Sequence, residues 1–151
     1  MRLVLCMTVS GKMLESQYRE RAGAYFSPLA RRLQVLDPGR LADRLDDAVD
    51  AGQLTASERT DVLQADIVLS GLRRDDRAEV YLVVEVSTGI GPHDVERAAR
   101  RARLLARLGQ PVVPVVAGEW IARETEAQAR AAGVWQVLDG HAVPPSLSAS
   151  A

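Results

Sequence analysis

The sequence of 151 residues has little lysine and cysteine, and it has no excess of charge of either sign. Its 19 basic and 20 acidic residues give a formal net charge of -1. Domains that bind nucleic acid often carry an overall basic excess, so any such surface must be local in this chain. Lys12 is the only lysine, and a GC-rich genome explains the arginine bias more simply than a function does.

The single Cys6 cannot form an intramolecular disulfide, and it cannot supply a cysteine metal cluster. Two histidines are also too few for a typical zinc cluster. The apolar run at residues 3–9 is far shorter than the roughly 20 residues that span a bilayer, and it lacks a small-residue cleavage site. We therefore expect a cytoplasmic protein with no membrane contact.

The length fits one domain, which we predict over residues 1–140. The hydrophobic share of 47% and the charged share of 26% are typical of globular proteins. Residues 141–151 contain no pattern that would bury them, since proline, serine and alanine dominate their end. We expect them to form a flexible tail.

The first part of the chain is predicted to be helical. Apolar residues at three- and four-residue spacing indicate a helix over residues 11–33, with a break near Ser27-Pro28, followed by an extended piece at 33–36. Asp37 and Pro38 are typical of a helix start, which predicts a second helix at 38–51. Residues 55–58 have the form of a capping box that begins a third helix. Residues 38–63 thus form a helical insertion.

The pattern then changes to extended structure. Residues 65–72 and 79–86 are rich in valine, leucine and isoleucine and are predicted to be strands. The polar turn between them is too short for a parallel crossover, so the two strands form an antiparallel hairpin. A helix at 92–108, a strand at 112–116, a helix at 119–132 and a strand at 134–138 follow. The fold class is α/β, with a mixed central sheet flanked by helices.

Two carboxylates lie in adjacent strands of this hairpin. Because the start of one strand lies beside the end of the other, Asp66 is expected near Glu85. A glutamate among valines needs a cation, a donor or solvent, and Mg²⁺ or Mn²⁺ bound by Asp66 and Glu85 would satisfy it. Alternatively, Glu85 pairs with an arginine and Asp66 caps the preceding helix.

Several sequence stretches, together with the order of the predicted elements, form a recognisable pattern. The stretches are Tyr18-Arg19-Glu20-Arg21, Ala24-Tyr25-Phe26, Ala65-Asp66-Ile67-Val68, Val83-Val84-Glu85-Val86-Ser87, Asp94-Val95-Glu96-Arg97-Ala98 and Val115-Val116-Ala117-Gly118. This pattern resembles the PD-(D/E)XK nuclease-like superfamily, in an uncharacterised bacterial branch. The resemblance covers about residues 11–140 and implies a restriction-endonuclease-like core over residues 64–140.

The resemblance implies a metal-dependent phosphodiesterase in which Asp66 and Glu85 are the motif carboxylates. A glutamate of the first helix often completes such sites, and both Glu15 and Glu20 qualify; Glu20 is preferred because it lies in the Tyr18–Arg21 stretch. Ser87 occupies the position of the usual lysine. Some relatives move that basic group to the next helix, where Arg97 is our candidate beside Arg100 and Arg101.

The sequence of the helix predicted at 92–108 indicates a basic face opposite an alanine-rich stripe. This face could follow a phosphate backbone, and the alternative is a solvated face with acidic neighbours. The candidate nucleic-acid-binding residues are Arg97, Arg100, Arg101, Arg103 and Arg107.

Three functions follow from these patterns. The first is a metal-dependent nuclease-like enzyme acting on DNA, and the second is a catalytically inactive relative that binds nucleic acid or protein. The third is a small dimeric scaffold, and a homodimer is expected. Gly89-Ile90-Gly91 lacks the third glycine and the lysine of a phosphate-binding loop, so no nucleotide cofactor is expected.

Overall fold

A mixed six-stranded sheet forms the centre of the protein. The computed structural model describes residues 2–146, with side chains described from residue 11 onward. The order of the strands is β1-β2-β3-β5-β7-β8, and β3, β5 and β7 are parallel to one another, while the remaining pairs are antiparallel. The strands are β1 (Arg31–Val35), β2 (Ile67–Leu72), β3 (Glu79–Val86), β5 (Val112–Gly118), β7 (Trp135–Leu138) and β8 (His141–Val143).

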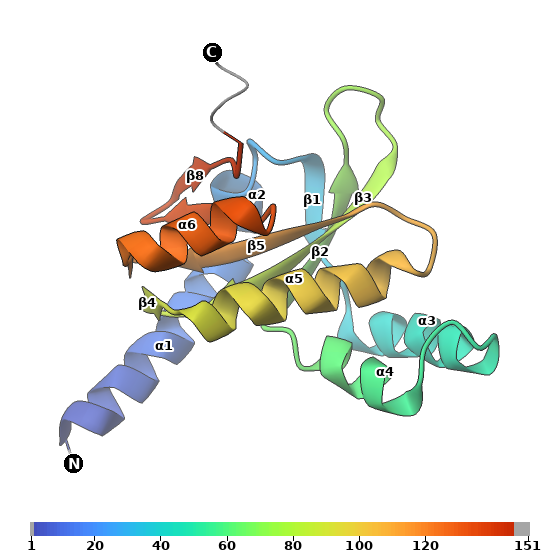
Figure 1. Cartoon of the computed structure of the whole chain (residues 1–151), viewed down its shortest axis with the longest axis horizontal. Coiled ribbons are helices and arrows are strands. Elements are labelled where there is room, and N and C mark those ends of the chain that lie inside the picture. Colours follow the sequence, from blue (N-terminus) through green and yellow to red (C-terminus); the bar gives the residue numbers. More distant parts are fainter. Residues whose placement is uncertain (1, 147–151) are drawn as a thin grey trace.

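Helices cover both faces of this sheet, as Figure 1 shows. On one face lie α1 (Arg2–Glu20) and α2 (Ala22–Tyr25), and α1 projects beyond the sheet. On the other face lie α3 (Pro38–Asp50), α4 (Ala56–Leu63), α5 (Pro92–Ala106) and α6 (Arg123–Ala131). The prediction of an α/β fold with a mixed sheet flanked by helices is confirmed.

The two faces of β3 belong to different parts of the core. Leu82 and Val84 pack with Tyr18 and Phe26 on the α1 and α2 side. Tyr81 and Val83 pack against the helices of the other face. Because side chains alternate along a strand, Glu85 points to the same face as Tyr81 and Val83. Glu85 therefore faces α5.

The predicted helical insertion lies between β1 and β2 and begins at the expected residues. Asp37 caps α3 by accepting a hydrogen bond from the backbone N–H of Arg40 at 3.1 Å. Thr55 and Glu58 form the reciprocal capping box of α4, with bonds of 3.1 and 2.9 Å. Both starts are local features, so the sequence alone was enough to find them.

The predicted helix over residues 11–33 was wrong at both ends. The helix α1 starts at Arg2, ends at Glu20 and is followed by the short α2, so the break comes at Arg21 and not near Ser27-Pro28. The extended piece predicted at 33–36 belongs to the edge strand β1, which covers residues 31–35 because it gains backbone hydrogen bonds to β2.

A β-bulge marks the pairing of this edge strand. Arg31 pairs with Leu72 and Gln34 with Ser70, so two residues of β1 lie opposite the single Gly71. A side chain at Gly71 would meet Leu33 Cδ2 at 2.8 Å and the carbonyl oxygen of Arg31 at 3.0 Å. The close approach of β1 therefore requires glycine at this position.

The C-terminal region also differs from its prediction. The helix predicted at 119–132 begins only at Arg123, because Trp120–Ile121 form β6, which pairs with β4 (Gly89–Ile90). The predicted tail begins with β8, since Asp139 and Gly140 adopt positive φ angles of 49° and 82° and return the chain onto β7. The prediction of flexibility for residues 147–151 lies outside the described residues.

Within residues 2–146, no helix has the length and apolar character needed to cross a membrane.

Candidate functional site

The two motif carboxylates meet at the open end of the β2–β3 hairpin. Ile67 pairs with Val84, so the next step of the register places Asp66 opposite Glu85. The Oδ2 atom of Asp66 accepts a hydrogen bond from the backbone N–H of Val86 at 2.8 Å. The predicted proximity of Asp66 to Glu85 is thus present, and it follows from the antiparallel register.

Glu85 is a buried carboxylate whose two oxygens have different surroundings. The residue is only 2% exposed, and its Oε1 atom accepts a hydrogen bond from Arg101 Nη1 at 2.9 Å. The Oε2 atom is buried and has no hydrogen-bond partner among the described residues. Burial, followed by the charge of Asp66, raises the pKa of Glu85 to about 7 despite the opposing effect of Arg101.

Glu15, and not the preferred Glu20, is the first-helix glutamate that lies near Asp66. Burial and the nearby carboxylate of Asp66 raise the pKa of Glu15. Arg19 lies between the two, with Nη2 at 3.6 Å from Glu15 Oε2 and at 2.6 Å from the carbonyl oxygen of Asp66. Glu20 is exposed, because it lies five positions further along α1 and on another side of the helix.

Ser87 is the residue that the sequence resemblance aligns with the usual lysine. Its side chain points to the start of α5. Its Oγ atom donates a hydrogen bond to Asp94 Oδ1 at 3.1 Å. The other oxygen of Asp94 accepts from the backbone N–H of Gly91 at 2.9 Å. Ser87 therefore helps to fix the turn into α5, and its hydroxyl supplies no positive charge.

Two arginines of α5 reach the Glu85 carboxylate. Arg97 Nε lies 3.6 Å from Glu85 Oε1, while its Nη2 atom donates to Asp94 at 2.6 Å. Arg97 is partly exposed, whereas Arg101 is only 5% exposed. The structure does not place Arg101 on the predicted basic face opposite the alanine-rich stripe: Arg101 is buried in one row with Ala98 and Leu105 of that stripe and faces Glu85.

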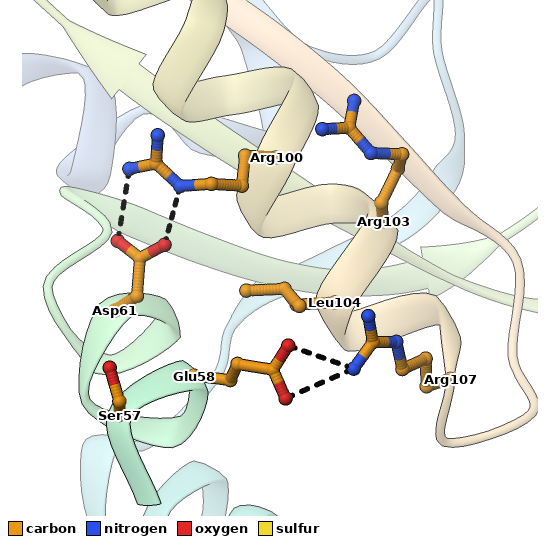
Figure 2. Close-up of a pocket in the computed structure, with 7 residues that line it drawn as sticks. All are labelled: Ser57, Glu58, Asp61, Arg100, Arg103, Leu104 and Arg107. Carbon is orange, nitrogen blue, oxygen red and sulfur yellow. Dashed lines mark hydrogen bonds and ion pairs between the residues drawn. The ribbon is translucent and has the colours of Figure 1, made fainter. Parts of the chain in front are cut away.

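The remaining arginines of α5 line an open pocket against α4, shown in Figure 2. Arg100 makes two hydrogen bonds to Asp61, and Arg107 makes two to Glu58. These contacts lower the pKa values of Asp61 and Glu58; for Glu58 the backbone N–H of Thr55 has the larger effect. The pocket has a volume of about 600 Å³, and Leu104 forms part of its wall.

The predicted basic face is therefore largely neutralised by α4. Arg103 is exposed and has no side-chain partner in the described part of the chain, but its neighbours along α5 are paired. This is the arrangement that the alternative of a solvated face with acidic neighbours predicted. It weakens the case for α5 as a continuous track for a phosphate backbone.

A divalent metal fits only part of this site. Among residues 2–146, no group of three or more histidine, cysteine, aspartate or glutamate side chains is arranged to hold an ion. Asp66 and Glu85 nevertheless offer hard oxygen donors, and the Oε2 atom of Glu85 lacks a partner. Magnesium commonly takes one or two carboxylates and completes its shell with water and phosphate oxygens, so this pair is the part of the site that fits such an ion.

Comparisons with protein families, with characterised proteins and with solved structures gave no match. The sequence offered Glu15 only as the second of two first-helix candidates, and it placed Arg101 on the basic face of the helix and not beside Glu85. Arg97 and Arg101 are one helical turn apart, on the side of α5 that includes Asp94. This spacing is the signal that could have indicated that Arg101 faces Glu85.

Proposed function

We propose that this protein is a nuclease-like phosphodiesterase that acts on DNA with Mg²⁺ or Mn²⁺. The observation that carries the proposal is the position of Asp66, just before β2, where its charge acts on Glu15 of α1 and on Glu85 of β3. Asp66 raises the pKa of both glutamates, although burial has the larger effect on each. Clustered carboxylates with perturbed pKa values are typical of sites that hold cations or move protons.

The arrangement of elements supports the same proposal. The order of a helix, three antiparallel strands, a crossover helix and a strand parallel to the third is found here in α1, β1, β2, β3, α5 and β5. This order agrees with the restriction-endonuclease-like core that the sequence resemblance implies. DNA as the substrate and a homodimeric assembly stay predictions.

The residues of the chain would have distinct roles in this function. Asp66 and Glu85 would hold the ion, which when bound supplies an activated water and stabilises charge on the scissile phosphate. Arg101 orients Glu85 through its 2.9 Å hydrogen bond. Arg97, which is partly exposed, can extend to a phosphate oxygen, where its permanent charge would stabilise the transition state without accepting a proton.

The second candidate function is an inactive relative that binds a nucleic acid or a protein partner. Two observations favour it. Ser87 replaces the lysine and is bonded to Asp94, and Arg101 already supplies the positive charge that Glu85 needs. In this function, the buried ion pair replaces the metal and the fold serves only as a scaffold.

A metal titration tests the first proposal. Mg²⁺ and Mn²⁺ are titrated calorimetrically into the parent protein and into the Asp66→Asn, Glu85→Gln double variant. We expect binding to the parent that weakens at least tenfold in the double variant. Glu15→Gln should weaken binding, and Glu20→Gln is the matched control on the same helix that should not. Equal binding by the parent and the double variant would reject the metal site.

A cleavage assay then separates the two candidate functions. The parent is incubated with single- and double-stranded DNA in the presence of the metal that binds. Products that depend on metal, and that the double variant does not form, support the phosphodiesterase. Metal binding without any product supports the inactive relative.

A further inference from the structure

A small pocket lies at the opposite end of the β2–β3 hairpin from Asp66 and Glu85, which are called the carboxylate cluster below. It is lined by Arg31 and Arg32 of β1, by Leu72 at the end of β2 and by Arg77 in the β2–β3 turn. Its volume is about 90 Å³, which is roughly the volume of three water molecules in the liquid. A group the size of a tetrahedral oxyanion fits such a space.

The three guanidinium groups of this pocket are unpaired. Within the part of the chain that the structure describes, Arg31, Arg32 and Arg77 make no side-chain hydrogen bond or ion pair. The acidic residues of the adjacent turn are engaged elsewhere: Asp76 bonds to Arg73 and to the backbone of Ala78, and Asp75 accepts from the backbone of Asp76.

The backbone at two of these arginines is unusual. Arg32 and Arg77 have φ angles of 53° and 60°, and Asp139 is the one other non-glycine residue with a positive φ among those described. Arg32 lies in the bulge of β1, and Arg77 lies in the hairpin turn. Glycine is the residue that ordinarily occupies such positions, followed by asparagine and aspartate. Arg32 and Arg77 depart from that preference and line the same pocket, and such outliers occur preferentially at ligand sites.

We propose that Arg31, Arg32 and Arg77 form a binding site for a phosphate group. Guanidinium groups donate parallel N–H bonds that match the oxygens of a phosphate. An anion would also reduce the repulsion among three arginines that line one small pocket and have no carboxylate partner among the described residues. The site is separate from the carboxylate cluster, because Asp66 and Glu85 lie at the other end of the same two strands. The proposal therefore does not depend on phosphodiesterase activity.

Calorimetric titration of inorganic phosphate into the full chain at low salt tests this site. We expect saturable binding to the parent and at least a tenfold loss of affinity in the Arg32→Gln, Arg77→Gln double variant. Arg123→Gln is the matched control, because Arg123 is an exposed arginine on α6 with no side-chain partner among the described residues. It should bind phosphate as the parent does.

A second variant separates loss of the site from loss of the fold. Glycine readily adopts positive φ, so the Arg32→Gly, Arg77→Gly double variant should unfold at or above the Tm of the parent and should still lose phosphate. The proposal is overturned if the parent binds no phosphate, or if either double variant binds it as tightly as the parent.

A nucleotide titration identifies the source of the phosphate group. A dinucleotide with a 5′-phosphate and the same dinucleotide without it are compared with inorganic phosphate in the parent. Tighter binding of the phosphorylated dinucleotide, again lost in both double variants, assigns the site to phosphate esters. If the phosphorylated dinucleotide binds no more tightly than inorganic phosphate, the site is assigned to the free phosphate ion. If the parent binds no inorganic phosphate and binds the two dinucleotides with the same affinity, the proposed site is contradicted.

Discussion

Arg101 donates a hydrogen bond of 2.9 Å to Glu85, and both residues are almost fully buried between α5 and the sheet. Arg101 also bonds to Asp61 of α4 at 3.0 Å, so one guanidinium joins the motif strand to the helical insertion. A buried pair of this kind stabilises a fold only when both partners are present, because a single remaining charge is costly to bury. The pair therefore links the stability of the protein to the state of its candidate site.

The protonation of Glu85 should make stability depend on pH. Its pKa is about 7 in the folded protein and near 4.5 when the chain is unfolded. The folded state therefore holds this proton more tightly, and the contribution of Glu85 to stability falls as pH rises from about 4.5 to 7, by about 3 kcal/mol. Denaturant unfolding at intervals between pH 4.5 and 8 measures this loss.

The Glu85→Gln variant is the reference for that experiment. Other carboxylates also titrate in the acid range, so the informative quantity is the difference between parent and variant at each pH. We expect the difference to change from about pH 4.5 to about one unit above pH 7, where Glu85 becomes almost fully ionised, and to be constant beyond that. A difference that is constant over the whole range would show that the pKa of Glu85 is not raised.

Removal of the Arg101 side chain should destabilise the fold far more than removal of the Arg100 side chain. Arg101→Met keeps much of the buried hydrocarbon but leaves Glu85 without its donor, so we expect a loss of about 3–5 kcal/mol in the free energy of unfolding. Arg100→Met removes an exposed partner of Asp61 and should cost no more than about 1 kcal/mol. Urea unfolding of the two variants compares them, and similar losses would contradict the buried pair.

A side chain at Gly118 should disrupt the end of β5. A Cβ atom there would lie 2.0 Å from the carbonyl oxygen of Ser87 and 2.9 Å from Ile90 Cγ1. Neither neighbour is the free end of a long side chain, so we expect Gly118→Ala to cost about 3 kcal/mol or more. Gly11→Ala is the matched substitution, because nothing lies within 4 Å of that position in α1, and it should stabilise by about 1 kcal/mol. Thermal unfolding measures both.

Loss of the α4 cap should give a smaller and purely local effect. Thr55→Ala removes the oxygen that accepts from the backbone N–H of Glu58 at 3.1 Å, and we expect a cost of about 1 kcal/mol. The exposed Ser57 lies in the first turn of the same helix, and Ser57→Ala should change the free energy of unfolding by less than about 0.5 kcal/mol. Equal effects of the two variants in urea unfolding would show that the cap contributes nothing.

Local patterns determined much of the fold. The caps at Asp37 and Thr55 and the short turn between β2 and β3 act over a few residues, so the sequence by itself located α3, α4 and the hairpin. The hairpin in turn placed Asp66 beside Glu85, because antiparallel register fixes which residues are opposite. The sequence also offered the two candidates Glu15 and Glu20 for the first-helix glutamate.

Only the tertiary structure decided the features that depend on distant contacts. The strands β6 and β8 exist through pairing with partners elsewhere in the sheets, and their short segments carry no periodicity of their own. The sequence indicated β1 only as an extended piece from residue 33, and its pairing with β2 fixed its bounds. The packing of α1 selected Glu15 over Glu20, since the position of a helix against a sheet fixes which side faces the site. Arg101 is buried because Glu85 and Asp61 meet its guanidinium from two other elements, and this compensation of a buried charge arises only when the chain has folded.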